Sequence, residues 1–197
     1  TSRDQSLADP TQTNPHIGGN TKVDVRYIGT IINVSGNGNG IKIDNSALTI
    51  KDLVFQARDP ATSSAGAVTS SGIYVTNGSV CTLDQGVVVA NFDIGIEVDN
   101  KSLLTQSSTS MNPFQSITNC NTGILIVDGS SCVLNGMFIT GCWNDGVVVN
   151  GNSSADLSSC AVIGCGKDGF ISSRNSDITA NRCFSVYNTQ NSAVGFS

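Results

Sequence analysis

Residues 123–145 have the sequence GILIVDGSSCVLNGMFITGCWND, and residues 146–168 have the sequence GVVVNGNSSADLSSCAVIGCGKD. Each stretch begins with Gly followed by an apolar residue, and together they show a period of about 23 residues. The same pair recurs along most of the chain, at Gly40-Ile41, Gly72-Ile73, Gly95-Ile96, Gly123-Ile124, Gly146-Val147 and Gly169-Phe170. The intervals that start at Gly72, Gly123 and Gly146 have this length, and those that start at Gly40 and Gly95 are longer by nine and five positions. A fixed period with occasional insertions is typical of a solenoid.

Three short segments in each interval have the pattern of a β-strand. The first follows the Gly and places apolar residues at alternate positions, as in Ile124 and Ile126. In the same interval the second is Cys132-Val133-Leu134 and the third is Met137-Phe138-Ile139. Residues that tolerate a left-handed backbone follow the first segment, namely Asn45, Asn77, Asn100, Asp128-Gly129 and Asn150-Gly151. Four residues before the next Gly we expect one row of corner residues, made of Asn91, Asn119, Cys142 and Cys165 and continued by Asn188.

The predicted fold is all-β: a right-handed, single-stranded parallel β-helix with about 23 residues and three short strands per coil. Neighbouring coils would then pair at the roughly 4.8 Å spacing of parallel strands. Leucine-rich repeats fit less well because the chain lacks regular Leu, and a β-sandwich would not repeat its sequence positions at a constant interval. Residues 1–39 are expected to form an N-terminal arm and a cap or first coil. Residues 40–197 are expected to form the β-helix, continuing beyond Ser197.

Charge and cysteine content exclude several classes of function. The net charge is −5, with 10 scattered Lys and Arg, so we expect no nucleic-acid partner. No apolar run approaches the roughly 18–20 residues that span a bilayer, so we expect no membrane insertion. The seven Cys lack zinc-site spacing and lie mostly among apolar neighbours, which predicts buried free thiols, no metal and no cofactor. Free thiols also favour synthesis in a reducing compartment.

Some apolar residues fall at positions that should face outward. The outward position of the first strand changes from polar to aliphatic along the chain: Lys42, Tyr74, Glu97, Leu125, Val148 and Ile171, with Val127 beside them. The third strand is apolar at both parities, as in Ala161-Val162-Ile163. Burial of such side chains is worth about 1.5–3 kcal/mol each, so we expect them to be covered. Either the chain forms a homo-oligomer through Leu125, Val127, Val148 and Ile171, or other parts of the polypeptide cover them.

The Gly-[Ile/Val/Phe]-x-[Ile/Val/Ser] motif, with Ser- and Asn-rich corners and Cys-rich third strands over Gly123–Asn188, resembles the right-handed parallel β-helix of bacteriophage tail fibres and tailspikes. These belong to the wider pectate-lyase-like superfamily. The resemblance covers about 155 of the 197 residues. It implies a homotrimer in the virion tail that is assembled in the host cytoplasm, associates with other tail proteins and binds host surface polysaccharide. Some relatives also cleave that polysaccharide, but no catalytic motif of the family can be placed on this sequence.

Carboxylates are the candidate catalytic groups, because polysaccharide hydrolysis needs a pair beside the scissile bond. Asp145 and Asp168 precede the leading Gly in consecutive coils and are expected to stack. Asp-Gly is equally a turn dipeptide. The single His16 lies in the Pro-rich arm and has no nucleophile motif in reach.

Candidate ligand-binding residues lie on the outer surface. Glu97 and Asp99 face outward from one strand, where they could contact a carbohydrate or a divalent cation, or simply be solvated. Trp143 with Asp145, and Tyr74 on a first strand, are candidate sugar contacts, although Trp143 would equally suit a subunit interface.

Three hypotheses follow. The first is a structural and adhesive segment of a phage tail fibre or tailspike that attaches to the host surface. The second is a polysaccharide depolymerase that uses paired carboxylates. The third is an autotransporter passenger, which the seven Cys disfavour because that class usually avoids cysteine.

Overall fold

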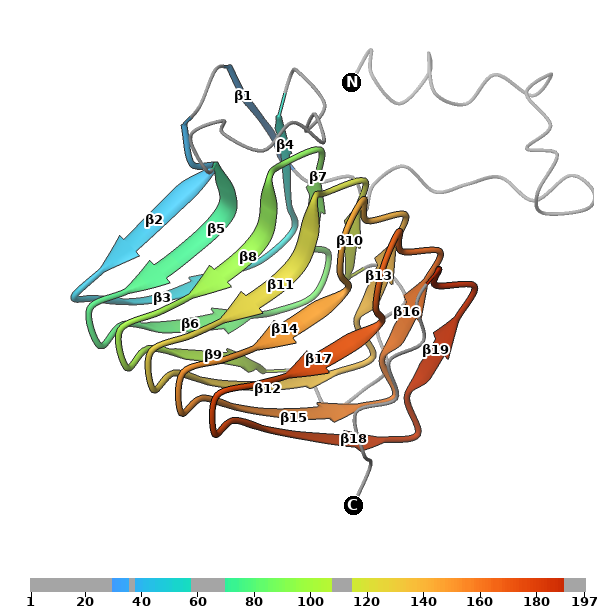
Figure 1. Ribbon diagram of the computed structural model, residues 1–197. Helices are drawn as coiled ribbons and strands as arrows, with labels where there is room; N and C mark the ends of the chain where they lie inside the picture. The colour runs from blue at the N-terminus through green and yellow to red at the C-terminus, as the bar shows by residue number, and fades with distance from the viewer. Residues whose placement is uncertain (1–29, 36–37, 58–69, 108–114, 190–197) are drawn as a thin grey trace, which may run out of the picture.

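The computed structural model describes residues 30–35, 38–57, 70–107 and 115–189. All regular structure in these residues is β-strand, arranged as three parallel sheets of seven, six and six strands (Figure 1). No helix in the described ranges has the length and apolar character to cross a membrane. The chain passes through the three sheets in turn and returns one layer further on, which makes the solenoid visible in Figure 1.

Sheet B contains the strands that follow the leading glycines, and it confirms the predicted column of stacked residues. Ile73 pairs with Ile96, Ile96 with Ile124, and Ile124 with Val147. Its six strands are β2 (Ile41–Asp44), β5 (Ser71–Thr76), β8 (Ile94–Val98), β11 (Thr122–Ile126), β14 (Val147–Val149) and β17 (Phe170–Ser172).

Sheet C contains the predicted second strands. Cys132 pairs with Ala155 and Leu134 with Leu157, so these residues also stack in the expected register. Its strands are β3 (Ala47–Ile50), β6 (Val80–Leu83), β9 (Leu103–Gln106), β12 (Ser131–Asn135), β15 (Ser154–Ser158) and β18 (Asp177–Asn181).

Sheet A contains the third strands and begins one coil earlier than the other two sheets. Its first strand pairs with the second from Thr30 opposite Leu53 to Val34 opposite Ala57. The preceding residues, including His16, lie outside the described ranges. Its strands are β1 (Thr30–Val34), β4 (Leu53–Ala57), β7 (Val88–Ala90), β10 (Ser116–Thr118), β13 (Phe138–Thr140), β16 (Ala161–Ile163) and β19 (Phe184–Val186).

The core is the interior of the coils, and it forms because alternate residues of every strand point inward. Ile96 and Ile124 are completely buried, whereas Glu97 and Leu125 between them are partly exposed. The leading Gly is needed because its backbone approaches the next coil. A Cβ at Gly72 would lie 2.7 Å from the carbonyl oxygen of Gly95, closer than a side chain tolerates.

A ladder of buried serines follows the corner between sheets B and C. The hydroxyl oxygen of Ser102 accepts the backbone N–H of Ser79, and that of Ser130 accepts the N–H of Ser102, each at 3.2 Å. Ser153 and Ser176 continue the pattern at 3.2 and 3.1 Å. Each hydroxyl therefore accepts a backbone N–H of the preceding coil, and the N–H groups of Ser102 and Ser130 are shared with the carbonyls of Asp99 and Val127, at 3.2 and 3.3 Å.

Cysteines occupy interior positions as predicted, and all seven are free thiols. Six are buried, and Cys183 is partly exposed. Burial raises the pKa of the Cys81 and Cys120 thiols to about 12. These two side chains therefore stay protonated at neutral pH and act as small apolar residues.

The predicted row of corner residues is wrong in part. The N–H of Trp143 donates to the carbonyl of Cys120, and the N–H of Asn144 donates to that of Asn121. Cys142 is therefore the register partner of Cys120 rather than of Asn119. The reason is that two offsets cancel. Ser116 and Phe138 of sheet A pair at one residue less than the basic period, and Trp143 then adds one residue at the corner.

Candidate ligand-binding surfaces

The outer face of sheet B carries a hydrogen-bonded polar group on its N-terminal coils. The Tyr74 hydroxyl donates to Asp99 Oδ2 at 2.8 Å, and the Ser71 hydroxyl donates to Glu97 Oε2 at 2.5 Å. Lys42 Nζ lies 5.7 Å from the centre of the Tyr74 ring and 2.8 Å from Asp44 Oδ2. Parallel stacking of β2, β5 and β8 creates this group, because Lys42 pairs with Tyr74 and Tyr74 with Glu97. The structure thus brings together three of the predicted ligand-binding residues.

Partial burial gives this group an unusual electrostatic character. Burial raises the pKa of the Glu97 carboxyl. The hydrogen bond from Ser71 lowers this pKa, and the nearby charges of Asp99 and Asp93 raise it further. Burial and the hydrogen bond to Asp99 also raise the pKa of Tyr74. The second oxygen of Asp99 is buried and has no partner within the described residues. Two carboxyl groups in different environments are what acid–base chemistry on a glycosidic bond requires.

Asp145 and Asp168 stack in neighbouring coils, as expected, but they serve the corner between sheets A and B. The Asp145 Oδ1 atom accepts the backbone N–H of Asp168 at 3.2 Å. Asp168 is itself buried, with 8% of its surface exposed. At least one oxygen of the proposed catalytic pair therefore stabilises the turn.

Trp143 is half exposed, at 51%. It lies at the corner before β14, whereas Tyr74 is on β5, so these two predicted sugar contacts belong to separate parts of the surface. The neighbouring Asn144 joins an amide ladder: its side chain donates to Asn121 Oδ1 at 2.6 Å, and Asn121 donates to Asp93 Oδ1 at 3.0 Å. The ladder leaves the Trp143 side chain accessible while fixing the backbone beside it.

The residues predicted to form an oligomer interface lie together on the outer face of sheet B. Leu125, Val148 and Ile171 form one stacked column, and Val127 follows β11 on the same side; all four are partly exposed. Sheet A exposes larger groups, with Phe138 at 40% and Phe184 at 64%. Contacts with a second chain remain a prediction.

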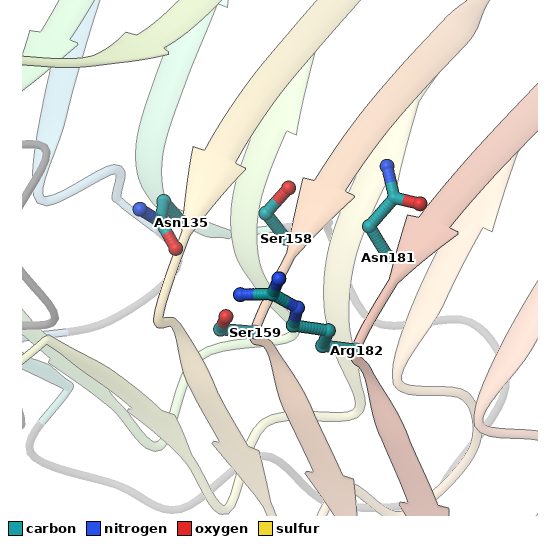
Figure 2. Close-up of a pocket in the computed structure, with 5 residues that line it drawn as sticks. All are labelled: Asn135, Ser158, Ser159, Asn181 and Arg182. Atoms are coloured by element: carbon teal, nitrogen blue, oxygen red, sulfur yellow. The ribbon is translucent and has the colours of Figure 1, made fainter.

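A polar hollow that the sequence analysis did not predict lies at the corner between sheets C and A (Figure 2). Its volume is about 320 Å³. Figure 2 shows side chains from three neighbouring coils around it, with the Arg182 guanidinium turned toward the two serines. The lining residues are Asn135, Ser158, Ser159, Asn181 and Arg182.

The sequence contained a signal for this hollow. Asn135, Ser158 and Asn181 follow one another at the basic period, and each ends a sheet C strand. The register places them side by side, with Asn135 opposite Ser158 and Ser158 opposite Asn181. Polar residues at a corner are ordinary in a solenoid, so the period alone did not distinguish a hollow from a solvated turn.

Among the described residues, no three His, Cys, Asp or Glu side chains are placed to hold a metal ion. Searches of curated proteins and of solved structures gave no significant match. A family model described as "Right handed beta helix region" matches residues 39–197. This match covers most of the chain and agrees with the three parallel sheets, so the chain belongs to the right-handed β-helix family.

Proposed function

We propose that this chain is a structural and adhesive β-helix segment of a phage tail fibre or tailspike, and that it attaches to host surface polysaccharide. The observation that supports this function best is the polar hollow of Figure 2, lined by amide, hydroxyl and guanidinium groups. Carbohydrates present hydroxyls that both donate and accept hydrogen bonds, and such side chains match both roles.

The solenoid supports this role through rigidity. Asn135, Ser158 and Asn181 are fixed by sheet register at the roughly 4.8 Å spacing of parallel strands. Because the backbone of this row is already in place, only its side chains have to be ordered on binding, which lowers the entropic cost of weak polar contacts. Arg182 adds a planar group with several donors. We place the contact with the glycan at this corner.

The test compares two arginines of the same coil. Arg182 and Arg174 both have a left-handed backbone, with φ of 55° and 50°, and both are exposed. Arg182 lines the hollow, whereas Arg174 lies at the other end of β18. Binding to surface polysaccharide of the host is measured by surface plasmon resonance. Arg182→Ala is expected to weaken binding about ten- to a hundredfold, in line with one lost charged hydrogen bond of about 1.5–3 kcal/mol.

Arg174→Ala should leave the affinity unchanged, and both variants should keep the melting temperature of the parent chain. Equal weakening by both variants would point to general charge attraction. Unchanged binding in Arg182→Ala would place the glycan elsewhere on the coil surface.

A second candidate function is a polysaccharide depolymerase. The raised pKa of Glu97, together with the Tyr74 hydrogen bond to Asp99, favours it. In this interpretation Glu97 supplies the proton to the leaving oxygen and Asp99 acts as the carboxylate partner. Release of reducing ends from host polysaccharide tests it, and a chain that binds glycan without releasing them is adhesive only.

We also propose that the chain forms a homotrimer and that the trimer is part of the virion tail. The half-exposed apolar columns of sheets A and B would be covered in a homotrimer, in contact with other tail proteins. The free thiols suit assembly in the reducing host cytoplasm before incorporation into the virion tail.

A further inference from the structure

Cys160 and Cys183 are register partners in the last two described coils. The next residues, Ala161 and Phe184, pair directly, and the N–H of Phe184 donates to the carbonyl of Cys160 at 2.9 Å. Partners in adjacent parallel strands lie about 4.8 Å apart. A disulfide requires a Cα separation of roughly 4.4–6.8 Å. The backbone therefore places these two cysteines within disulfide range.

The two side chains also have the same orientation. The Cys160 thiol lies 3.4 Å from the carbonyl oxygen of Ser158, and the Cys183 thiol lies 3.6 Å from the equivalent oxygen of Asn181. Each sulfur is in hydrogen-bonding range of the other. The pair is thus preformed, and closing it needs side-chain rotation rather than movement of a coil.

The two thiols differ in access and in acidity. Cys160 is buried, with 2% of its surface exposed, whereas Cys183 is only partly buried. The hydrogen bond from Cys160 lowers the pKa of Cys183 to about 7, and the same contact with burial raises the pKa of Cys160. Because the thiolate is the nucleophile, Cys183 is the thiol that reacts first.

We propose that Cys160 and Cys183 are a redox-active dithiol that closes to a disulfide between adjacent coils when it meets a small-molecule disulfide such as oxidised glutathione. The Cys183 thiolate attacks one glutathione sulfur, and the S–S bond breaks to release one glutathione thiolate. Cys160 then loses its proton to solvent and attacks the Cys183 sulfur, which releases the second glutathione. Two thiols of the protein are oxidised, and one glutathione disulfide is reduced to two thiols.

A second cysteine pair provides an internal comparison. Cys142 and Cys165 are also register partners, because the N–H of Gly166 donates to the carbonyl of Cys142 at 2.8 Å, and their sulfurs are likewise in contact. Both are buried, with 2% and 1% of their surfaces exposed. Cys142 and Cys165 have the same spacing but no access to glutathione, so this pair should not react. Exposure of one thiol, rather than stacking, therefore selects the reactive pair.

The test treats the full native chain with oxidised glutathione at pH 8, blocks the remaining thiols and maps the unreduced peptides. Combined cleavage at Lys, Arg and Asp gives residues 156–167, which contain Cys160 and Cys165, and residues 183–197, which contain Cys183. The two peptides are expected to be joined, with the molecule lighter by two hydrogens. The melting temperature should rise, because the link holds the last described coil to its neighbour.

Cys165→Ser should leave the link intact. In Cys160→Ser the reaction should stop at the mixed disulfide, in which Cys183 carries one glutathione. A parent chain in which Cys183 stays free, or keeps glutathione without reacting further, would overturn the proposal. So would a Cys142–Cys165 link formed at the same rate. Fragmentation of the joined peptides from the parent chain shows whether Cys160 or Cys165 holds the link, so the proposal is decided even if a variant fails to fold, and the result is independent of glycan binding.

Discussion

The N-terminal and C-terminal coils have the same interior and different exteriors. Inward positions of sheet B are Ile73 and Ile96 in the first half, and Ile124 and Val147 in the second, all in one buried column. The outward column beside it starts with Lys42, Tyr74 and Glu97 and ends with Leu125, Val148 and Ile171. The interior must fill a coil of constant size, so it cannot vary much. The exterior has no such constraint, and its change along the chain points to function.

The two halves also differ in regularity. The intervals that start at Gly40 and Gly95 carry insertions, whereas those that start at Gly72, Gly123 and Gly146 have the basic period. The register recovers after both insertions, since Lys42 still pairs with Tyr74 and Glu97 with Leu125. The insertions therefore do not disturb the register of the described strands on either side. A solenoid can gain surface features in this way at little cost to its core.

The largest expected effect is the loss of stability when a core residue is truncated, compared with truncation of the adjacent outward residue on the same strand. Ile124 is completely buried, and Leu125 is partly exposed on the outer face. Ile124→Ala should lower the free energy of unfolding by about 2–5 kcal/mol, because it leaves a cavity. Leu125→Ala should cost less than about 1 kcal/mol in an isolated chain, a value typical of surface sites. Urea unfolding followed by circular dichroism measures both.

The Leu125 result also sharpens the contrast between exteriors. If a second chain covers the C-terminal outer column, Leu125→Ala should shift the sedimentation coefficient toward the monomer at low protein concentration. An equal loss of stability in both variants, with an unchanged monomeric sedimentation coefficient, would break the distinction between a constrained interior and a free exterior.

A smaller effect is expected at the serine ladder, which both halves share. Ser130→Ala removes one of the two acceptors of the Ser102 N–H and leaves the Asp99 carbonyl at 3.2 Å, so it should lower the free energy of unfolding by about 0.5–1.5 kcal/mol. The adjacent Ser131 provides the control, because its hydroxyl pairs with that of Ser154 at the surface at 3.1 Å. Ser131→Ala should change stability by less than about 0.5 kcal/mol. Amide hydrogen exchange at Ser102 should accelerate only in the first variant.

The fold was predictable because its main determinant is periodic. Inward Ile and Val residues such as Ile96 and Ile124 are spaced by the coil length, and parallel register follows from that spacing. The corners were less predictable, because their geometry depends on single residues. The extra residue Trp143 does not change the spacing between the leading glycines, so that spacing predicts Asn119 as the partner of Cys142, whereas the structure pairs Cys142 with Cys120. Side-chain roles at corners cannot be derived from period alone.

The same limit applies to the candidate sites. Outward pairing of Glu97 with its neighbours could be predicted from strand parity, and the structure brings Tyr74, Glu97 and Asp99 together. The hollow beside Arg182 could not be predicted in this way, since it depends on the side-chain positions where three neighbouring sheet C strands end. The buried serines were hidden for a similar reason: Ser130 resembles any polar turn residue until its hydroxyl is seen to accept the N–H of Ser102.

The smallest expected effect concerns charge on the N-terminal exterior. Because burial raises the pKa of Glu97 in the folded chain, the folded state binds a proton more tightly than the unfolded state. The stability this provides is fully present below the unfolded pKa and is lost as pH rises through the folded pKa. Glu97→Gln cannot ionise, so its melting temperature relative to the parent chain should increase as pH rises from 4 to 7. Calorimetry across this range measures the trend.

Asp44 on the same face should show the opposite sign. The hydrogen bond from Lys42 lowers the pKa of Asp44, so its stabilising contribution is present above the unfolded pKa and is lost as pH falls through the folded pKa. Asp44→Asn should therefore lose melting temperature relative to the parent chain as pH rises, by a small amount because both side chains are exposed. Replacing Leu125, which holds the equivalent outward position to Glu97 in the next coil, with Ala should give no trend with pH. A trend of the same sign in Glu97→Gln and Asp44→Asn would mean that net charge, rather than the local burial of Glu97, governs the N-terminal surface.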